Sequence, residues 1–429
     1  MKYRRSIAVL VGMLLIFCHS SRSIAAQTVT YQYPGLSFER TEAYRMFRKA
    51  HPGIKLQSKQ NLDMDNVLYI QQQMVNQGTD MDIYHTRTMD NSLKAILSKG
   101  YYVPLQQGPD ILRFTEGMYP VVRQAVMQGN DIAQLPIGTY LPYLYLLNPE
   151  LMGRIGLSRE EFPSTFPELI RFAEEWPQRY GSAYPDIKPL YISVGDPLVE
   201  ARNFAAPLML RAYLYSMTAS EQEVRFDTPL FRSLLKDIAP LTRRMDPSSQ
   251  SDDVMFDTPQ WGECLFYVIW NTSPFYTPRM ELLPPLPLES GGAQVQPLVL
   301  NAAHMNPYSK SMDASLQWLS FLAKYPDPVL SRTLGTESTP IDNPNYKNMA
   351  PAVRTEADRY LLSPAELEQY QQRLVPYLYV CGRSAFEAPG FLTQAESLLA
   401  QYLDGALPEE MLIKQLDNTI RLVTTEGSI

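Results

Sequence analysis

Between residues 28 and 100 a short strand pattern is followed by an amphipathic helix pattern three times, which constrains the fold more than any other feature. The strand patterns occupy residues 28–33, 54–57 and 81–85. The helix patterns begin near residues 38, 67 and 93 and end at "HPG" (51–53), Gly78 and Gly100. Short connections between such elements predict right-handed crossovers, a parallel sheet and an α/β fold.

The middle of the chain is more helical, and short strands and proline-rich turns are expected around 255–300. Because 429 residues are too many for one core, two domains are expected. Residues 135–152, "LPIGTYLPYLYLLNPELM", contain three tyrosines in an apolar run, and "PLVLN" (297–301) is typical of a buried strand. Capping boxes and apolar spacing predict helices after Thr165, Thr228 and Ser363 and over 309–325, 391–404 and 408–423.

The first 26 residues have the pattern of an export signal. Lys2, Arg4 and Arg5 precede the apolar run 7–17, which is too short to span a bilayer, and small residues follow at 23–26. A membrane anchor or an N-terminal core helix is the alternative. "LIFC" is similar to a bacterial lipobox with Phe17 at the usual small position, so a lipid anchor on Cys18 stays open. We expect an exported protein, either periplasmic or at the outer cell surface.

The formal charge and the cysteine content limit which binding partners and which disulfides are expected. Loss of residues 1–26 removes four of the 38 basic residues and none of the 45 acids, which changes the formal charge from −7 to −11. No basic stripe remains, which argues against nucleic-acid binding. Cys264 and Cys381 could pair in an exported protein, but two buried free thiols is the preferred interpretation.

Motifs of catalysis and of metal or cofactor binding are absent from the sequence. The four histidines form no H-E-x-x-H, and there is no C-x-x-C, G-x-S-x-G or glycine-rich phosphate loop. We therefore expect no catalytic residues, no metal and no cofactor. A glycosidase needs only two carboxylates, so 45 acids do not exclude one by counting.

Five segments resemble one known family in order and spacing. They are 43–56 "AYRMFRKAHPGIKL", 80–88 "DMDIYHTRT", 135–152, 156–176 "GLSREEFPSTFPELIRFAEEW" and 306–325 "NPYSKSMDASLQWLSFLAKY". Together they resemble the extracellular solute-binding proteins of bacterial ABC importers (family 1), the class that includes maltose-binding protein. Asn148-Pro149 and the segment 262–270 around Cys264 depart from the family pattern.

The resemblance implies a periplasmic-binding-protein-like fold of type II, in which two α/β lobes close on a ligand at a hinge. Crossings between the lobes are expected in 134–140, near 297–301 and around 335–345. Lobe 1 would comprise 27–136 and 301–338, and lobe 2 would comprise 137–300 and 339–429. Within 135–152, Pro136 to Tyr140 are expected to form the hinge and cleft floor, and Leu144 to Leu147 are expected to be buried sheet of lobe 2.

Candidate ligand-binding residues lie near these crossings or at the carboxyl ends of the predicted strands, where open parallel sheets bind ligands. Aromatic faces suit the apolar faces of sugar rings, and planar polar groups suit hydroxyls. The candidates are Tyr33, Asp63, Tyr84, Arg87, Tyr140, Tyr143, Trp261, Trp270, Asn271 and His304. The alternatives are core packing for each aromatic residue, helix capping for Asp63 and a solvated loop charge for Arg87. Trp176 and Trp318 lie on helical faces and are predicted core residues.

Three functions are compatible with these features. The first is a monomeric, non-enzymatic protein that captures a sugar or oligosaccharide and delivers it to the membrane permease of an ABC transporter. The second is a ligand-sensing subunit for a membrane receptor kinase, and the third is a secreted carbohydrate-active enzyme. A neighbouring permease gene would separate the first from the second, and product release from an oligosaccharide would support the third.

Overall fold

The computed structural model describes residues 27–32, 42–59, 67–88, 97–192, 205–244, 263–271, 280–336, 364–382, 384–387 and 390–426. The predicted export signal and Cys18 lie outside these ranges. Within them, none of the helices combines the length and apolar character needed to cross a bilayer. Nor do three or more His, Cys, Asp or Glu side chains gather there into a group that could hold a metal ion.

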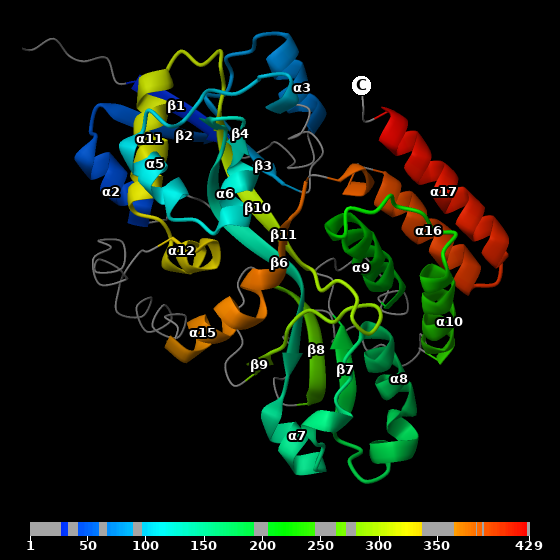
Figure 1. Cartoon of the computed structure of the whole chain (residues 1–429). Coiled ribbons are helices and arrows are strands. Elements are labelled where there is room, and N and C mark those ends of the chain that lie inside the picture. Colours follow the sequence, from blue (N-terminus) through cyan, green and yellow to red (C-terminus); the bar gives the residue numbers. More distant parts are fainter. Residues whose placement is uncertain are drawn as a thin grey trace, which may run out of the picture.

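The first three strands and the two helices between them follow the predicted alternation (Figure 1), and most of the third predicted helix, near 93–100, lies outside the described residues. Strand β1 (Gln27–Gln32) pairs in parallel with β2 (Ile54–Lys59) and with β3 (Ile83–Arg87). The connecting helices are α2 (Glu42–Ala50) and α3 (Val67–Val75). Phe47 of α2 packs in the cluster that contains Ile83, whereas Ile70 and Met74 of α3 pack with Tyr84. Since neighbouring strand residues point to opposite faces, the two helices cover opposite faces of the sheet.

Two long strands continue the sheet, which is mixed rather than parallel throughout. Strand β10 (Gln296–Met305) is antiparallel to β3 and to β6 (Leu135–Leu147). The sheet order is β2-β1-β3-β10-β6-β8-β7, where β8 is Cys264–Asn271 and β7 is Lys188–Ile192. The short strands β9 (Glu281–Leu282) and β11 (Leu378–Val380) pair with β6 and β10, and β4 (Met127–Gln128) pairs with β5 (Asp131–Ile132).

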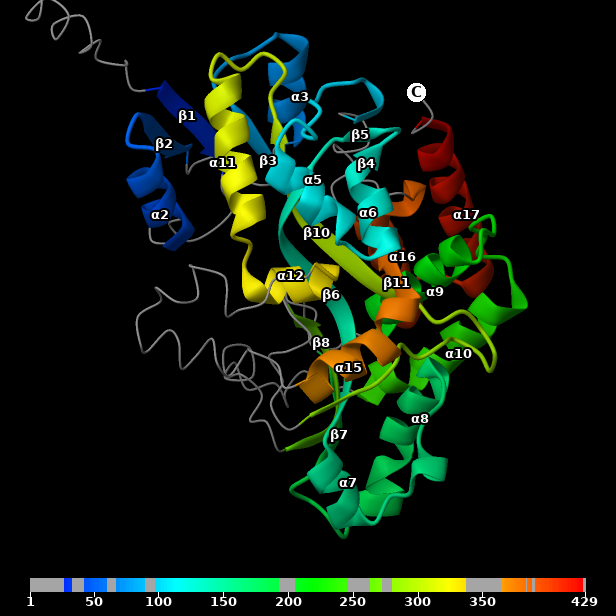
Figure 2. The same cartoon turned by 60° about the vertical axis from the view of Figure 1, so that its left-hand side comes forward.

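Two groups of helices surround this sheet (Figure 2). We call the first group, together with β1–β3, the upper part: α2, α3, α5 (Pro109–Glu116), α6 (Pro120–Val126), α11 (Met312–Lys324) and α12 (Pro328–Leu334). The second group, together with β7–β9, is the lower part: α7 (Pro149–Ile155), α8 (Phe166–Trp176), α9 (Ala205–Ala219), α10 (Pro229–Arg244), α16 (Phe391–Leu403) and α17 (Glu409–Glu426). Helix α15 (Pro364–Arg373) lies near α12, where the Tyr370 hydroxyl donates to the Thr333 carbonyl at 2.8 Å.

Several helix starts confirm the sequence prediction in detail. The Thr165 hydroxyl accepts from the Glu168 backbone N–H, and the Glu168 carboxylate accepts from the Thr165 N–H, which is the predicted capping box. At the start of α10 the Thr228 hydroxyl accepts from the Phe231 N–H at 3.1 Å. Such caps satisfy N–H groups that the helix itself leaves without partners.

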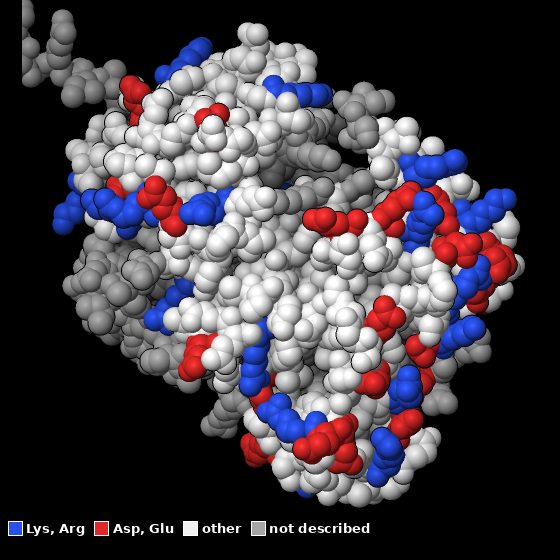
Figure 3. All heavy atoms as spheres, viewed as in Figure 1, with Lys and Arg blue, Asp and Glu red and all other residues white. Residues whose placement is uncertain are grey.

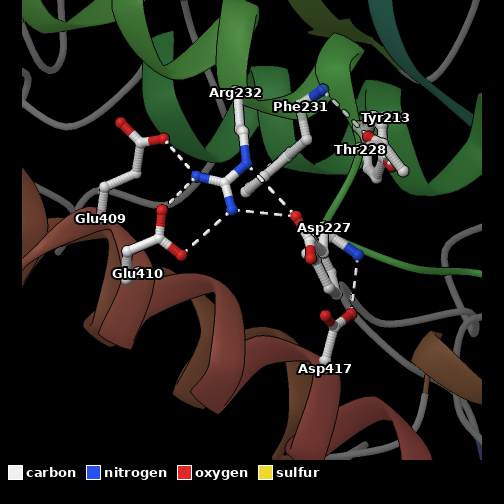
Figure 4. A network of polar contacts seen from close by, with 9 residues as sticks. Tyr213, Asp227, Thr228, Phe231, Arg232, Glu409, Glu410 and Asp417 are labelled. Carbon is white, nitrogen blue, oxygen red and sulfur yellow. Dashed lines mark hydrogen bonds and ion pairs between the residues drawn. The ribbon is translucent and has the colours of Figure 1, made fainter.

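A charged network joins α10 to α17 (Figure 4). The Arg232 guanidinium donates to Asp227 and Glu409 at 2.9 Å each and to Glu410 at 2.7 Å. Asp417 of α17 accepts from the Phe226 backbone N–H at 2.7 Å. These contacts hold the last helix, α17, against α10 and the segment that precedes it.

The core is apolar on both sides of the long strands. Trp176 and Trp318 are 4% and 2% exposed, which confirms both as core residues. Leu144 to Leu147 are buried in the pairing of β6 with β8, as the sequence predicts. Cys264 and Cys381 are buried free thiols, which confirms the preferred interpretation, and burial raises the pKa of Cys264 to about 11.

Candidate functional site

Strand β6 exchanges one partner for another part-way along its length. Residues 135–140 pair with β10, and residues 141–147 pair with β8. The register shifts between Leu141 and Leu144, and Tyr143 within this bulge has a φ of +62°. The Gln296 side chain donates to the Pro142 carbonyl at 2.8 Å and ties the bulge to β10. The first crossing segment predicted from the sequence, 134–140, thus lies in the stretch that pairs with β10.

Strand β10 likewise has partners from both parts of the chain. Residues 301–305 pair with β3 of the upper part, and residues 296–298 pair with β11, which precedes α16. Figure 3 shows the same side of the molecule as Figure 1, with all heavy atoms drawn. On this face Lys and Arg side chains are interspersed with Asp and Glu rather than gathered in one stripe. Of the third predicted crossing, around 335–345, only residues 335 and 336 are described.

Arg87 and Tyr140 are the sequence candidates that the crossing leaves partly exposed. Arg87 is the last residue of β3 and lies opposite Asn301 of β10. Tyr140 lies opposite Val299 at the end of the pairing between β6 and β10, and its ring packs partly against the core of the lower part. Both side chains therefore lie on strands that meet at the crossing.

His304 is fully buried behind these residues. Its Nε2 lies 2.6 Å from the Thr86 hydroxyl oxygen, and burial lowers the pKa of His304 to about 4. Burial also lowers the pKa of the neighbouring His85 to about 3, and the charges of His304 and Arg87 add to the effect. Both imidazoles are neutral near pH 7. Contact of His304 with a ligand stays a prediction.

Tyr84 and Tyr143 are buried in this conformation, with 1% and 5% exposure. The Tyr84 hydroxyl accepts from the Asn306 side chain at 3.1 Å. Tyr143 packs in the lower core, where burial raises its pKa and the charge of Arg211 opposes that shift. Both environments correspond to the core-packing alternative, and each tyrosine hydroxyl already has a hydrogen-bond partner, Asn306 for Tyr84 and Arg211 for Tyr143.

The side chains of the remaining candidates lie outside the described part of the chain. Tyr33, Asp63 and Trp261 lie outside the described residues. Trp270 and Asn271 end strand β8, where Asn271 pairs with Leu141 of β6, but the positions of their side chains are not described.

Sequence reasoning missed three residues at the crossing: Gly138, His85 and Asn301. Asn301 pairs with Arg87 on one side and with Gly138 of β6 on the other. The signal in the sequence was a single polar residue at the end of the apolar run "PLVLN". The sequence does not show which residues lie opposite Asn301, because the pairing register of strands that are far apart in the chain depends on non-local contacts.

Solved structures with this architecture are numerous. Maltose-bound MalE3 of T. maritima has a TM-score of 0.59 and 18% identity, over 93% of this chain and all of that chain. The ABC substrate-binding protein Lmo0181 of Listeria monocytogenes, in complex with cycloalternan, has a TM-score of 0.59 and 14% identity, over 94% and 100%. The fold is that of the type II periplasmic binding proteins.

Another similar structure is the Agrobacterium vitis solute-binding protein with bound D-mannitol, at a TM-score of 0.58 and 15% identity over 94% and 98% of the two chains. No protein-family model and no curated protein matches the chain. Because the identities are low, the likeness establishes the fold, and function has to be argued from the site.

Proposed function

We propose that the chain is an extracytoplasmic solute-binding protein that captures a sugar or oligosaccharide between two lobes and delivers it to an ABC transporter permease. One observation carries the proposal: the chain matches sugar-bound ABC binding proteins over more than nine-tenths of its length and of theirs. These neighbours are binding proteins rather than enzymes, which supports a non-enzymatic role. Export through residues 1–26, a monomeric state and the lobe boundaries at 136/137, 300/301 and 338/339 belong to the same proposal.

The ligand would lie where β6 and β10 pass between the two parts. Tyr140 would offer an aromatic face to a sugar ring, and Arg87 would donate to hydroxyl oxygens. Closure of the lobes around the ligand would then create the surface that a permease reads.

Thermal unfolding with a panel of monosaccharides and oligosaccharides tests the proposal. A ligand at about 100 times its Kd stabilises the folded state by about 2.7 kcal/mol, which raises the Tm by several degrees. We expect such a rise with at least one sugar, together with a smaller radius of gyration in small-angle scattering. Amino acids and peptides serve as the comparison panel. A response to that panel alone, or to neither panel, would contradict the proposal.

Tyr140→Ala should weaken binding of the responding sugar by about tenfold or more, since it removes the aromatic face. Tyr140→Phe keeps the ring and should bind within a few-fold of the unmodified protein. Tyr184→Ala is the matched control, because Tyr184 is also half-buried but lies in the turn after α8. Titration calorimetry measures the three affinities. Equal losses for Tyr140→Ala and Tyr184→Ala would exclude a specific role for Tyr140.

A further inference from the structure

Two buried asparagines, Asn301 in the middle of β10 and Asn306 directly after it, differ in the hydrogen bonds that their side chains make. The Asn306 amide donates to the Gly78 and Met81 carbonyls and to the Tyr84 hydroxyl, at 2.7 to 3.1 Å. Asn301 is 8% exposed, and its Oδ1 has no hydrogen-bond partner among the described residues. Asn306 is thus fixed by the fold, whereas the acceptor of Asn301 is unused.

The surroundings of Asn301 leave room for its carboxamide. Gly138 lies directly opposite on β6, and a Cβ atom built on this glycine would lie 3.2 Å from the Asn301 Nδ2. The carboxamide therefore lies over a backbone without a side chain. Arg87 lies opposite on the other edge of β10, and directly opposed residues in a sheet project to the same face.

His85 adds a second unused polar atom on this face. It precedes Arg87 by two positions on β3, so both side chains project to the same side of the sheet. The imidazole is 4% exposed, and its Nε2 has no partner among the described residues. Its lowered pKa keeps the ring uncharged near neutral pH. Asn301 and His85 together present uncharged donors and acceptors.

Unsatisfied buried polar atoms are costly and uncommon in native proteins. Two of them lie on adjoining strands where both crossing strands meet, beside the partly exposed Arg87. A bound molecule that supplies the missing hydrogen-bond partners would explain why both unsatisfied atoms lie at the crossing. It would also explain why the protein tolerates their cost in folding free energy, since binding sites often reduce stability in favour of function.

We propose that Asn301, placed over Gly138 and diagonally across from His85 on the same face, is the hydrogen-bonding floor of the ligand site and recognises adjacent hydroxyls of an uncharged sugar. The inference rests on the proposed function and specifies it further. A carboxamide is planar and offers both donors and an acceptor, which suits two neighbouring hydroxyl groups. The chain places the recognising group in the rigid sheet rather than in a loop.

Asn301→Leu separates a binding role from a structural one. Leucine has the same branching and the same number of side-chain heavy atoms as asparagine but no polar atoms, so the ligand-free Tm should stay the same or rise. Affinity for the sugar identified with the unmodified protein should fall by about tenfold or more. Thermal unfolding measures the first quantity and titration calorimetry the second. Unchanged affinity, or a clear fall in the ligand-free Tm, would overturn the assignment of Asn301.

Gly138→Ala provides an independent second variant. Its φ lies outside the left-handed region, so alanine strains only the contact with Asn301. We expect weaker binding than in the unmodified protein with a similar ligand-free Tm. Asn306→Ala is the matched control, and it should lower the ligand-free Tm because four side-chain hydrogen bonds are lost. If Gly138→Ala binds as tightly as the unmodified protein, the floor lies elsewhere.

The two proposals fail in different ways. If the unmodified protein responds to no sugar, the proposed function is wrong and the role of Asn301 falls with it. If the unmodified protein responds and both Asn301→Leu and Gly138→Ala respond equally well, sugar capture stands and the assignment of Asn301 is wrong.

Discussion

Replacing Gly382 by alanine should lower the free energy of unfolding by about 3 kcal/mol or more, because a new methyl group would collide with backbone. Gly382 has a φ of +101°, and a Cβ atom there would lie 1.8 Å from the Thr88 carbonyl oxygen. That oxygen belongs to the main chain, so relief requires two backbone segments to separate.

The collision occurs where the ends of two strands meet beside β10. The Thr88 N–H donates to the Leu300 carbonyl at 2.9 Å, and the Cys381 N–H donates to the Leu298 carbonyl at 2.9 Å. Strand β3 runs antiparallel to β10 and β11 runs parallel to it, so their carboxyl ends approach each other. A side chain at Gly382 would push this junction between the upper and lower parts apart.

Gly390→Ala is the matched control for Gly382→Ala. Gly390 has a similar φ of +91°, but no atom lies within 4 Å of its added Cβ position. The control therefore reports the left-handed backbone cost alone, about 1–2 kcal/mol. Chemical denaturation of both variants measures the difference. Equal destabilisation would show that the approach to Thr88 is not a tight contact in solution.

Elements with strong local signals were predictable from the sequence. The capping box at Thr165 and Glu168 and the strand at Leu144 to Leu147 both depend on residues close in the chain. The antiparallel position of β10 between β3 and β6 was harder to predict, because those strands are far apart in sequence. Loop closure and strand register then decide the neighbours, and neither leaves a local pattern.

The candidate site shows the same limit. Tyr140 was placed near the crossing because it follows a recognisable segment, and the structure leaves it partly exposed. Tyr84 and Tyr143 have the same residue type, but neighbours such as Asn306 and the lower core bury them. Asn301 was not among the predicted site residues, because an asparagine at the end of an apolar run is common in sequences. Its side chain becomes informative only once the structure shows that its Oδ1 has no hydrogen-bond partner among the described residues. Burial and unsatisfied polar atoms are properties of the packed chain.

The buried histidines should make the fold sensitive to mild acid. The pKa of His304 is lowered from 6.5 to about 4, mainly by burial, and that of His85 to about 3. Because the unfolded chain takes up these protons near pH 6.5 and the folded chain resists them, stability is retained above pH 6.5 and is lost as the pH falls toward 4. A lowering of about 2.5 pKa units for His304 corresponds to a loss on the order of 3 kcal/mol.

The acid sensitivity should follow the histidines themselves. We expect the free energy of unfolding, measured with urea, to fall between about pH 6.5 and about pH 4.5, and to fall less in a His85→Gln/His304→Gln variant. The variant is expected to be less stable at neutral pH if it loses the contact between His304 Nε2 and the Thr86 hydroxyl, which is 2.6 Å long. The test is therefore the slope of the free energy of unfolding with pH, and not its value at neutral pH. Acidic residues contribute their own slope mainly below about pH 5, so the upper part of this range reports the histidines. An unchanged slope there would mean that water reaches both rings in the folded protein. Because His85 and Asn301 both belong to the proposed floor of the ligand site, that result would also mean that water enters this floor in the ligand-free protein.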